Sequence, residues 1–268
     1  MEYIIHNNIS AEQRAPFVDL RNSKQKDVFI AETDKIISSL LASNLEITSL
    51  YITTEFFESK LAEIKAHHQE KVCDILIAEK EEMEQVVGYP LHQGIMAEVK
   101  IPEQITVEAL IEKTSSPHLF VVLEEIADAE NMGSIIRTAA GLGAQGIIIS
   151  KRSINPWIRR SVRVSMGTIF DIPIIVTDDL NSSLQELRKN GIKTFATYIS
   201  DSAETLWDVN FRSDSALIFG SEGHGLTEEL IGQCDALVQI PMSGAVDSLN
   251  VSMAVGLCLY EVNRQRGE

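Results

Sequence analysis

The chain has 268 residues, 44% of them hydrophobic and 23% charged, which is typical of a globular protein with one large or two ordinary domains. Its net charge of −16 argues against a protein that binds nucleic acid over its whole surface, because phosphate binding depends on Lys and Arg. The apolar runs are too short to cross a bilayer, the N-terminal residues lack the pattern of a signal peptide, and three scattered cysteines form no CxxC pair. We therefore expect a cytoplasmic protein that has no membrane association and keeps its cysteines reduced.

The first 100 residues predict a small α/β domain, because short apolar runs alternate with helical patterns from Asp27 to about Lys100. Thr33, followed by apolar residues at 36, 37, 40 and 41, predicts a capped amphipathic helix. Residues 101–117 mix Pro, Ser and Thr around a short helical piece at 107–113, so we expect a linker there. The strands predicted in this domain are 28–31, 47–52, 74–78 and 95–99.

Residues 118–268 predict a second domain with a doubly wound parallel sheet. Its first strand, Leu119–Leu123, is apolar without alternation, as expected for a parallel strand that is covered on both faces. Helical patterns separate most of the following strands, as the crossovers of a parallel sheet require. The further strands are predicted at 146–149, 172–176, 193–197, 216–219 and 237–240, and the helices at 134–142, 157–164, 180–190, 227–234 and 249–262.

Three polar stretches of this second domain lie where a strand gives way to a loop or helix, and such strand ends bind ligands in open α/β sheets. The first is NMGSIIRTA at 131–139, the second GSEGHGL at 220–226 and the third IPMSGAVDSLNVSM at 240–253. No GxGxxG follows the first strand and no P-loop pattern occurs, so the sequence shows no obvious phosphate-binding loop for a dinucleotide or triphosphate.

Each polar residue of these stretches can be explained either by a structural role or by a functional one. The carboxylate of Glu222 lies among glycines that a tight turn alone would explain. Arg137 suits an anionic ligand or a buried salt bridge, for which Glu222 is a candidate partner, and Asn131 suits a ligand or a helix cap on a loop-to-helix segment. Ser248 and Asn250 are explained either as site residues or as cap and solvent residues, with Asp247 as another capping candidate.

Positive charge concentrates in two segments of this acidic chain. Residues 151–170 carry five basic side chains and no acidic one, and a second basic group lies near the N-terminus. Either segment, taken alone, is explained by an ordinary solvated face. The residues concerned are Lys151, Arg152, Arg159, Arg160 and Arg163 in the first segment and Arg14, Arg21, Lys24 and Lys26 in the second.

Taken together, the three stretches resemble the SpoU/TrmH family of the SPOUT superfamily, which are RNA ribose 2′-O-methyltransferases that use S-adenosylmethionine. The family patterns N-x-G-x-x-x-R-x-A, G-S-E-G-x-G-L and I-P-x-x-G-x-x-x-S-L-N-V-S occur in order at 131–139, 220–226 and 240–252. The resemblance spans about residues 119–266 and includes VSMGTIF at 164–170. Residues 1–100 resemble the family's N-terminal substrate-binding domain, an α/β fold related to a ribosomal RNA-binding protein.

The resemblance implies a deep trefoil knot in the methyltransferase domain, with the second and third stretches as the knot loops. It also implies a homodimer, in which the first stretch lies near the partner subunit. By analogy with the family, the cofactor pocket is lined by Gly220, Ile240 and Leu249, with Thr197 as a further candidate.

The reaction that the resemblance implies is an in-line attack of a ribose 2′-hydroxyl on the methyl carbon of a sulfonium, which requires alignment and removal of a proton but no metal. The catalytic residues implied are Arg137, Asn131, Glu222, Ser248 and Asn250. A guanidinium stays protonated at ordinary pH, so we expect Arg137 to position the phosphodiester and stabilise the developing alkoxide. RNA contacts are expected at Arg159, Arg160, Arg163, Arg21 and Lys24.

Several alternatives stay open at this point. Ribosomal RNA is favoured over transfer RNA by the N-terminal domain, and transfer RNA remains the second candidate. A knotted RNA-binding protein without catalytic activity is a further alternative, against which the intact motif residues argue. A methyltransferase acting on another class of substrate is the last one, and the N-terminal domain and the basic segment argue against it.

Overall fold

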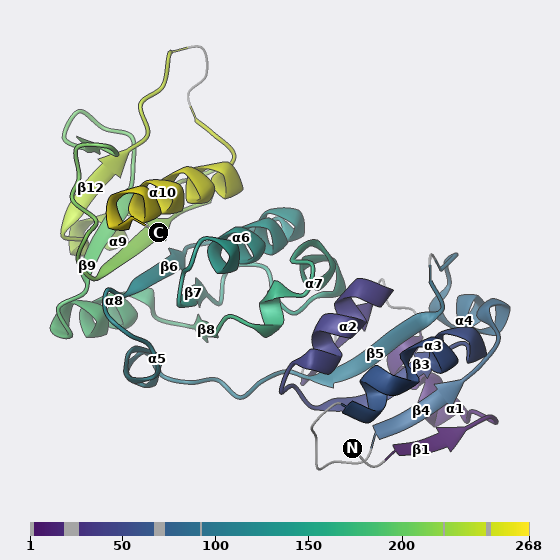
Figure 1. Ribbon diagram of the computed structural model, residues 1–268. Coiled ribbons are helices and arrows are strands. Elements are labelled where there is room, and N and C mark those ends of the chain that lie inside the picture. Colours follow the sequence, from purple (N-terminus) through teal and green to yellow (C-terminus); the bar gives the residue numbers. More distant parts are fainter. Residues whose placement is uncertain are drawn as a thin grey trace. The chain divides into compact units, whose positions relative to one another are not determined.

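The computed structural model describes residues 3–18, 27–66, 73–91, 93–221, 223–244 and 248–267 (Figure 1). The chain divides into two compact units, each with its own sheet. Unit 1 contains the N-terminal part up to Glu103 together with Trp157–Phe170, and unit 2 contains Gln104–Pro156 and Asp171 onward. None of the helices in the described residues is long and apolar enough to span a membrane.

Unit 1 is built on a mixed five-stranded sheet in the order β1-β4-β3-β5-β2. The pairs β1–β4 and β4–β3 are parallel, whereas β5 runs antiparallel to both β3 and β2. The predicted strands are confirmed to within two residues at each end, and the sequence patterns missed β1. The bounds are β1 Tyr3–His6, β2 Val28–Glu32, β3 Ile47–Ile52, β4 Cys73–Ile77 and β5 Ile95–Lys100.

The helices of unit 1 include one that the sequence predicted with the wrong cap. The helix after β2 buries Ile36, Ile37, Leu40 and Leu41, as predicted. Thr33, however, has φ 83° and makes no side-chain cap bond; instead Asp34 N donates to Gln93 Oε1 at 2.6 Å. The bounds are α1 Ala11–Arg14, η1 Ala15–Phe17, α2 Asp34–Ala42, α3 Thr54–Ala66, α4 Lys80–Val87, α7 Arg159–Val164 and η2 Thr168–Phe170.

Unit 2 contains the predicted parallel sheet, with one more strand than expected. Its order is β10-β12-β9-β11-β6-β7-β8, and every neighbouring pair is parallel. The additional strand is the two-residue edge strand β10, which is too short to leave a hydrophobic pattern. The bounds are β6 Leu119–Leu123, β7 Gly146–Ser150, β8 Ile174–Thr177, β9 Lys193–Thr197, β10 Glu204–Thr205, β11 Ser215–Phe219 and β12 Ala236–Gln239.

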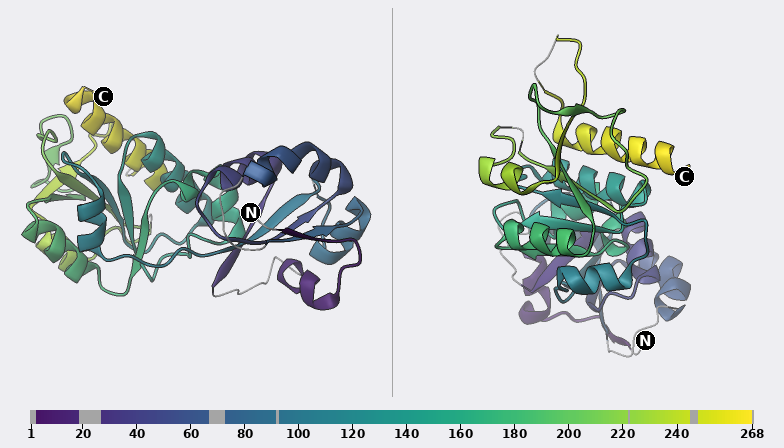
Figure 2. Two further views of the ribbon diagram at one scale, coloured as in Figure 1. Left: turned by 60° about the horizontal axis from the view of Figure 1, so that its bottom comes forward. Right: turned by 90° about the vertical axis from the view of Figure 1, so that its left-hand side faces the viewer.

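Helices cover both faces of this sheet (Figure 2). On one face α5, α8 and α9 pack against alternate strand residues in one apolar cluster, and on the other α6 and α10 lie side by side. The short helix expected in the linker, α5, buries Leu110 so closely over β7 that a side chain at Gly146 would collide with it. The bounds are α5 Val107–Lys113, α6 Ala129–Gly141, α8 Leu180–Lys189, α9 Glu228–Gln233 and α10 Val251–Arg266.

Candidate active site

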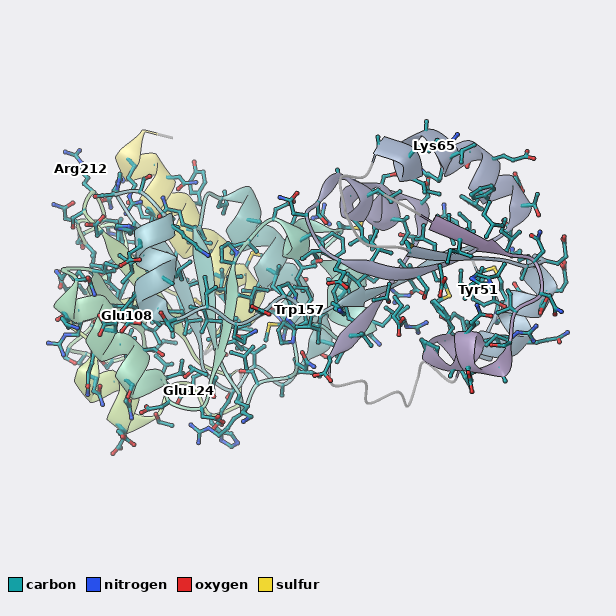
Figure 3. All side chains as sticks on the ribbon, turned by 90° about the horizontal axis from the view of Figure 1, so that it is seen from below. Tyr51, Lys65, Glu108, Glu124, Trp157 and Arg212 are labelled. Atoms are coloured by element: carbon teal, nitrogen blue, oxygen red, sulfur yellow. The ribbon has the colours of Figure 1, made fainter. Side chains whose placement is uncertain are left out.

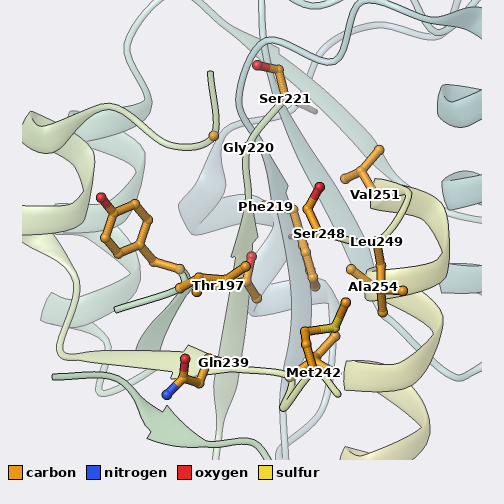
Figure 4. Close-up of a pocket in the computed structure, with 14 residues that line it drawn as sticks. Thr197, Phe219, Gly220, Ser221, Gln239, Met242, Ser248, Leu249, Val251 and Ala254 are labelled. Carbon is orange, nitrogen blue, oxygen red and sulfur yellow. The ribbon is translucent and has the colours of Figure 1, made fainter. Parts of the chain in front are cut away.

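The carboxyl ends of β9, β11 and β12 converge with the start of α10 around a cavity of about 250 Å³ in unit 2 (Figure 4). Parallel strands place their carboxyl ends at one edge of the sheet, which explains why loops far apart in sequence meet here. The lining residues are Thr197, Tyr198, Ile199, Phe219, Gly220, Ser221, Gly225, Gln239, Ile240, Met242, Ser248, Leu249, Val251 and Ala254.

All four residues expected to bind the cofactor line this cavity: Thr197, Gly220, Ile240 and Leu249. Thr197 is the last residue of β9, and its Oγ1 donates to the carbonyl of Ile218 on the neighbouring β11 at 2.8 Å. Gly220 and Ile240 directly follow β11 and β12. The structure therefore brings these four residues together, while their role toward a ligand stays a prediction.

Gly220 permits a close approach of two backbone segments at the cavity wall. A Cβ atom built on Gly220 would lie 2.1 Å from the carbonyl carbon and oxygen of Gly225, so only glycine fits here. Ser221 and Gly225 form an isolated antiparallel bridge, and Gly225 N donates to Ser221 O at 2.9 Å. These contacts hold the backbone at Ser221 close to the backbone at Gly225 within the segment 220–226. Glu222 belongs to this segment but lies outside the described residues.

A pair of asparagines joins the first and third stretches beside the cavity. Asn250 Nδ2 donates to Asn131 Oδ1 at 2.9 Å. The Oδ1 atom of Asn250 accepts from both the backbone N and the hydroxyl of Ser252, at 2.9 and 2.6 Å. The amide of Asn250 therefore both caps α10 and reaches Asn131. The capping alternative is confirmed for Asn250, which occupies the N-cap position instead of Ser248 or Asp247.

Asn131 itself does not cap a helix, which corrects the expected helix start. Helix α6 begins five residues earlier than predicted, because the carboxylate of Asp128 accepts from the backbone N of Glu130 and Asn131 at 2.8 and 2.9 Å. Asn131 therefore lies inside the first turn of α6, and this position directs its side chain toward the N-terminus of α10.

The remaining predicted catalytic residues differ in their surroundings. Ser248 lines the cavity and is exposed. Arg137 is also exposed on α6, and within the described part of the chain its guanidinium has neither a hydrogen bond nor an ion pair. The buried salt bridge considered for Arg137 is thus not formed with any described residue. An exposed guanidinium that pairs with none of the described residues suits a group that binds an external anion.

Two of the arginines expected to bind RNA are paired inside unit 1. Glu32 is largely buried; its Oε2 lies 3.3 Å from Arg159 Nη1 and its Oε1 lies 3.5 Å from Arg163 Nη1. Arg159 also donates to the hydroxyl of Tyr89 and stacks over its ring at 4.5 Å. Burial, reinforced by the neighbouring Glu32 carboxylate, raises the pKa of Tyr89, so its hydroxyl stays protonated and donates to Glu32 at 3.1 Å.

The other residues expected to contact RNA fall into two groups. Arg160 is exposed on α7. Arg21 and Lys24 lie outside the described residues. Since Trp157 and Phe170 pack on Phe29 with ring centroids 5.0 and 5.9 Å away, the basic segment is anchored to unit 1 by apolar contacts as well as by charge. RNA binding by these residues remains a prediction.

Sequence reasoning missed several cavity residues that adjoin the predicted ones. Tyr198 and Ile199 follow Thr197, and Gln239 precedes Ile240. They carried no motif, but their position directly at strand ends would have marked them, because side chains there face the same edge of the sheet.

The cavity fits a neutral, largely apolar ligand surface. Its described lining has apolar side chains from Ile240, Met242 and Leu249, hydroxyls or amides from Thr197 and Gln239, exposed backbone at the glycines, and no ionisable carboxylate or amine. Apolar walls with a few polar groups are typical of a cofactor pocket. The neutral adenosine part of a cofactor such as S-adenosylmethionine would suit this lining, where apolar side chains would contact the base and backbone groups would bond to its polar edges.

Two protein-family models match the chain. One, described as the SpoU rRNA Methylase family, matches residues 118–260, which is more than half of the chain. The other, described as RNA 2'-O ribose methyltransferase substrate binding, matches residues 35–105.

Relatives and solved structures agree with these matches. A Pseudomonas putida protein named 23S rRNA (guanosine-2'-O-)-methyltransferase RlmB is 32% identical over 227 residues, covering 82% of this chain and 89% of that protein. The putative TrmH family tRNA/rRNA methyltransferase YacO of Bacillus subtilis is 32% identical over 248 residues, covering 91% and 98%. The fold is also similar to that of an AdoMet-bound rRNA methyltransferase from Sinorhizobium meliloti, with a TM-score of 0.81, 24% identity and 98% coverage of both chains.

Proposed function

Because this chain belongs to the SpoU rRNA methylase family, we propose that it transfers a methyl group from S-adenosylmethionine to a ribose 2′-hydroxyl of RNA. The observation that carries the proposal is the convergence of Thr197, Gly220, Ile240 and Leu249 on one cavity, beside the hydrogen-bonded pair of Asn131 and Asn250. Residues from all three motifs thereby meet at one edge of one sheet.

Ribosomal RNA is the substrate class that we propose, with transfer RNA as the second candidate. The P. putida relative carries a 23S rRNA methyltransferase name, whereas the B. subtilis relative is named for both tRNA and rRNA. The match of residues 35–105 to a substrate-binding model supports the proposed N-terminal RNA-binding domain at 1–100, and the match of residues 118–260 supports the methyltransferase domain at 118–268. The linker at 101–117 belongs to the same proposal. A cytoplasmic location belongs to the same proposal.

In this proposal the cavity residues hold the cofactor, which supplies a methyl group bound to a sulfonium. Ile240 and Leu249 wall the cofactor with apolar surface, and Gly220 contributes backbone to the lining where its missing side chain lets Gly225 approach. Thr197 is fixed by its bond to Ile218 O and contributes a positioned oxygen. These residues orient the methyl carbon toward the acceptor and keep water from it.

Arg137, Asn131, Ser248, Asn250 and Glu222 act on the acceptor side. Arg137 binds the substrate phosphate and stabilises the developing alkoxide, as its exposed guanidinium allows. Asn250, oriented by Asn131 and Ser252, presents its amide near the ribose together with the hydroxyl of Ser248. Glu222 completes the set by its place in the second motif.

A homodimer and a trefoil knot are further parts of the proposal. Helix α10 exposes Met253, Leu257 and Tyr260 in a stripe with helical spacing, and such an unpaired apolar face is typical of a subunit interface. The knot rests on the family resemblance, with the segments 220–226 and 240–252 as its loops.

The direct test is methyl transfer from labelled S-adenosylmethionine to purified ribosomal RNA and transfer RNA, followed by mapping of 2′-O-methylated positions. We expect label in ribosomal RNA at a ribose. RNA binding without transfer would favour the catalytically silent alternative, and label in a protein or small metabolite would place the activity in another class.

A further inference from the structure

Glu124 is a buried carboxylate that none of the three motifs contains. It follows directly after β6, its side chain is 3% exposed, and Figure 3 labels it in unit 2. A carboxylate leaves water at a large cost unless several donors surround it. The donors around Glu124 therefore indicate what this residue stabilises.

The bonds of Glu124 reach both stems of the segment 220–226. Its backbone N donates to the carbonyl of Phe219 at 2.9 Å, immediately before Gly220. Its Oε2 accepts from Thr227 N at 2.8 Å and its Oε1 from Thr227 Oγ1 at 2.9 Å, immediately after Leu226. One residue thus bonds to both ends of a seven-residue loop.

The described residues of this loop have few other contacts outside it. Within the described residues, the hydrogen bonds of its tip stay inside the loop, from Gly225 N to Ser221 O and from His224 N to Ser221 Oγ. The side chain of Leu226 is buried in the apolar cluster of unit 2. Among the described residues, Glu124 and Leu226 therefore supply the contacts that connect the loop to the sheet and its apolar cluster.

The position of the loop sets one wall of the cavity. Gly220, Ser221 and Gly225 all line it, and the backbone of Gly225 occupies the space where a side chain at Gly220 would lie. A shift of the chain at Thr227 would change the distance between these residues and the other lining residues, among them Ile240 and Leu249. A fixed wall lowers the ordering cost of ligand binding.

Arg152 completes the surroundings of the carboxylate from the β7 side. Its Nη2 lies 3.3 Å from Glu124 Oε1 and its Nη1 lies 2.9 Å from Glu125 Oε1, while its side chain is largely exposed. The arginine offsets the two adjacent negative charges and is itself available to solvent. The strong, buried bonds of Glu124 are those to Thr227.

We propose that Glu124 is a positioning residue for cofactor binding, which holds the loop 220–226 in the shape that the cavity requires. The inference rests on the proposed function for the identity of the cofactor, but the loop contact itself does not. A purely structural role for Glu124 would lower stability without changing the affinity of the folded protein.

The test compares Glu124→Gln with Glu261→Gln in the full-length protein. Glu261 is a matched control because it is also a buried carboxylate, bonded to Arg264 and Gln265 on α10 at 2.7–2.8 Å, and it does not line the cavity. A Gln side chain at 124 has nearly the same volume and still faces Arg152, but it has one acceptor oxygen in place of two. It therefore cannot accept both hydrogen bonds from Thr227.

For Glu124→Gln we expect the dissociation constant for S-adenosylmethionine, measured by calorimetry, to rise at least about tenfold. The KM for the cofactor should rise in parallel, with kcat at saturation changed less than about threefold. For Glu261→Gln we expect only a lower melting temperature. Thr227→Val, which removes one donor, should shift the affinity in the same direction by less, and it keeps the test available should Glu124→Gln fold poorly.

Hydrogen exchange supplies a readout that needs no cofactor. Amides of 220–226 should exchange faster in Glu124→Gln and Thr227→Val than in the wild type or Glu261→Gln. Unchanged exchange in this loop, or wild-type cofactor affinity in Glu124→Gln, overturns the proposal. A wild-type protein that binds no S-adenosylmethionine would instead contradict the proposed function, and the exchange measurement would still decide the role of Glu124.

Discussion

Asn250 donates a hydrogen bond from Nδ2 to Oδ1 of Asn131 over 2.9 Å, between residues 119 positions apart. This bond connects the N-cap of α10 with the first turn of α6, and it lies where the third motif passes the cavity. The side-chain amide of Asn250 is oriented by a further bond from Ser252, and the backbone N of Asn131 donates to the capping carboxylate of Asp128. Such mutual orientation is what a catalytic pair requires before substrate arrives.

Asn250→Ala is expected to lower kcat by about 100-fold while costing about 1 kcal/mol of stability, the usual effect of losing an N-cap. Asn263→Ala is the matched control, because Asn263 also joins α10 to the end of α6, through a bond of 3.0 Å to Leu142 O. Steady-state kinetics and thermal melting of both variants provide the check. A collapsed melting temperature without a kinetic defect in Asn250→Ala would favour capping as its only role.

Arg137→Ala is expected to reduce methyl transfer by at least about 100-fold, because a donor to the developing negative charge is removed. Cofactor affinity should stay within about twofold, since Arg137 does not line the cavity. Arg212→Ala removes another exposed positive charge of unit 2 and should leave turnover unchanged. Normal turnover in Arg137→Ala would contradict the assignment of this arginine.

The parallel sheet of unit 2 could be predicted from sequence because its strands are buried on both faces and therefore read as continuous apolar runs. The start of α6 could not, because Asp128 Oδ1 bonds to two backbone donors in a segment whose apolar pattern begins only at Met132. Edge strands β1 and β10 are short and half exposed, so they leave no periodic signal.

The candidate site was predictable to the extent that its residues form contiguous motifs. The sequence could not indicate the contacts between distant positions of the chain that give those residues their geometry. The bond from Asn250 to Asn131 and the bonds from Thr227 to Glu124 join positions about 100 or more residues apart, and no local pattern encodes such distances. The same holds for Glu32, which pairs with Arg159 over 127 positions, while RNA contact by Arg159 stays a prediction.

Arg163→Ala and Arg159→Ala are expected to have different effects. Arg163 is about half exposed and lies 3.5 Å from Glu32, so its loss should weaken RNA binding and reduce the slope of log K against log salt by about one. Arg159 is more buried, stacked on Tyr89 and bonded to Glu32, so its loss should lower the stability of unit 1 by about 1–2 kcal/mol. Fluorescence anisotropy with RNA at several salt concentrations, paired with urea unfolding, separates the two. Equal salt slopes for wild type and Arg163→Ala would exclude Arg163 as a phosphate contact.

Acid should destabilise unit 2 partly through Asp214. Burial alone would raise the pKa of Asp214, but bonds from His118 N at 2.6 Å and Ser116 Oγ at 2.8 Å hold the pKa below its ordinary value of 3.8. A depressed folded-state pKa contributes stability above the unfolded value, and this stability is lost as the pH falls through the folded value. Urea midpoints should therefore decline below about pH 4 more steeply in the wild type than in Asp214→Asn. The exposed Asp201→Asn serves as control, and identical pH slopes in all three proteins would count against this role.

Leu257→Glu is expected to convert a dimer into a monomer. Leu257 lies at the centre of the exposed apolar stripe of α10, between Met253 and Tyr260, which are 58% and 61% exposed. A stripe of this kind on a helix adjoining the site is unfavourable in water unless a second surface covers it, and a buried carboxylate at its centre would have no partner.

Trp207→Glu makes the same kind of change at a 61% exposed residue outside α10 and should remain dimeric. Light scattering coupled to size exclusion at matched concentrations measures the mass of each variant. A monomeric wild type, or a Leu257→Glu protein with the wild-type mass, would show that another surface, or none, joins two copies.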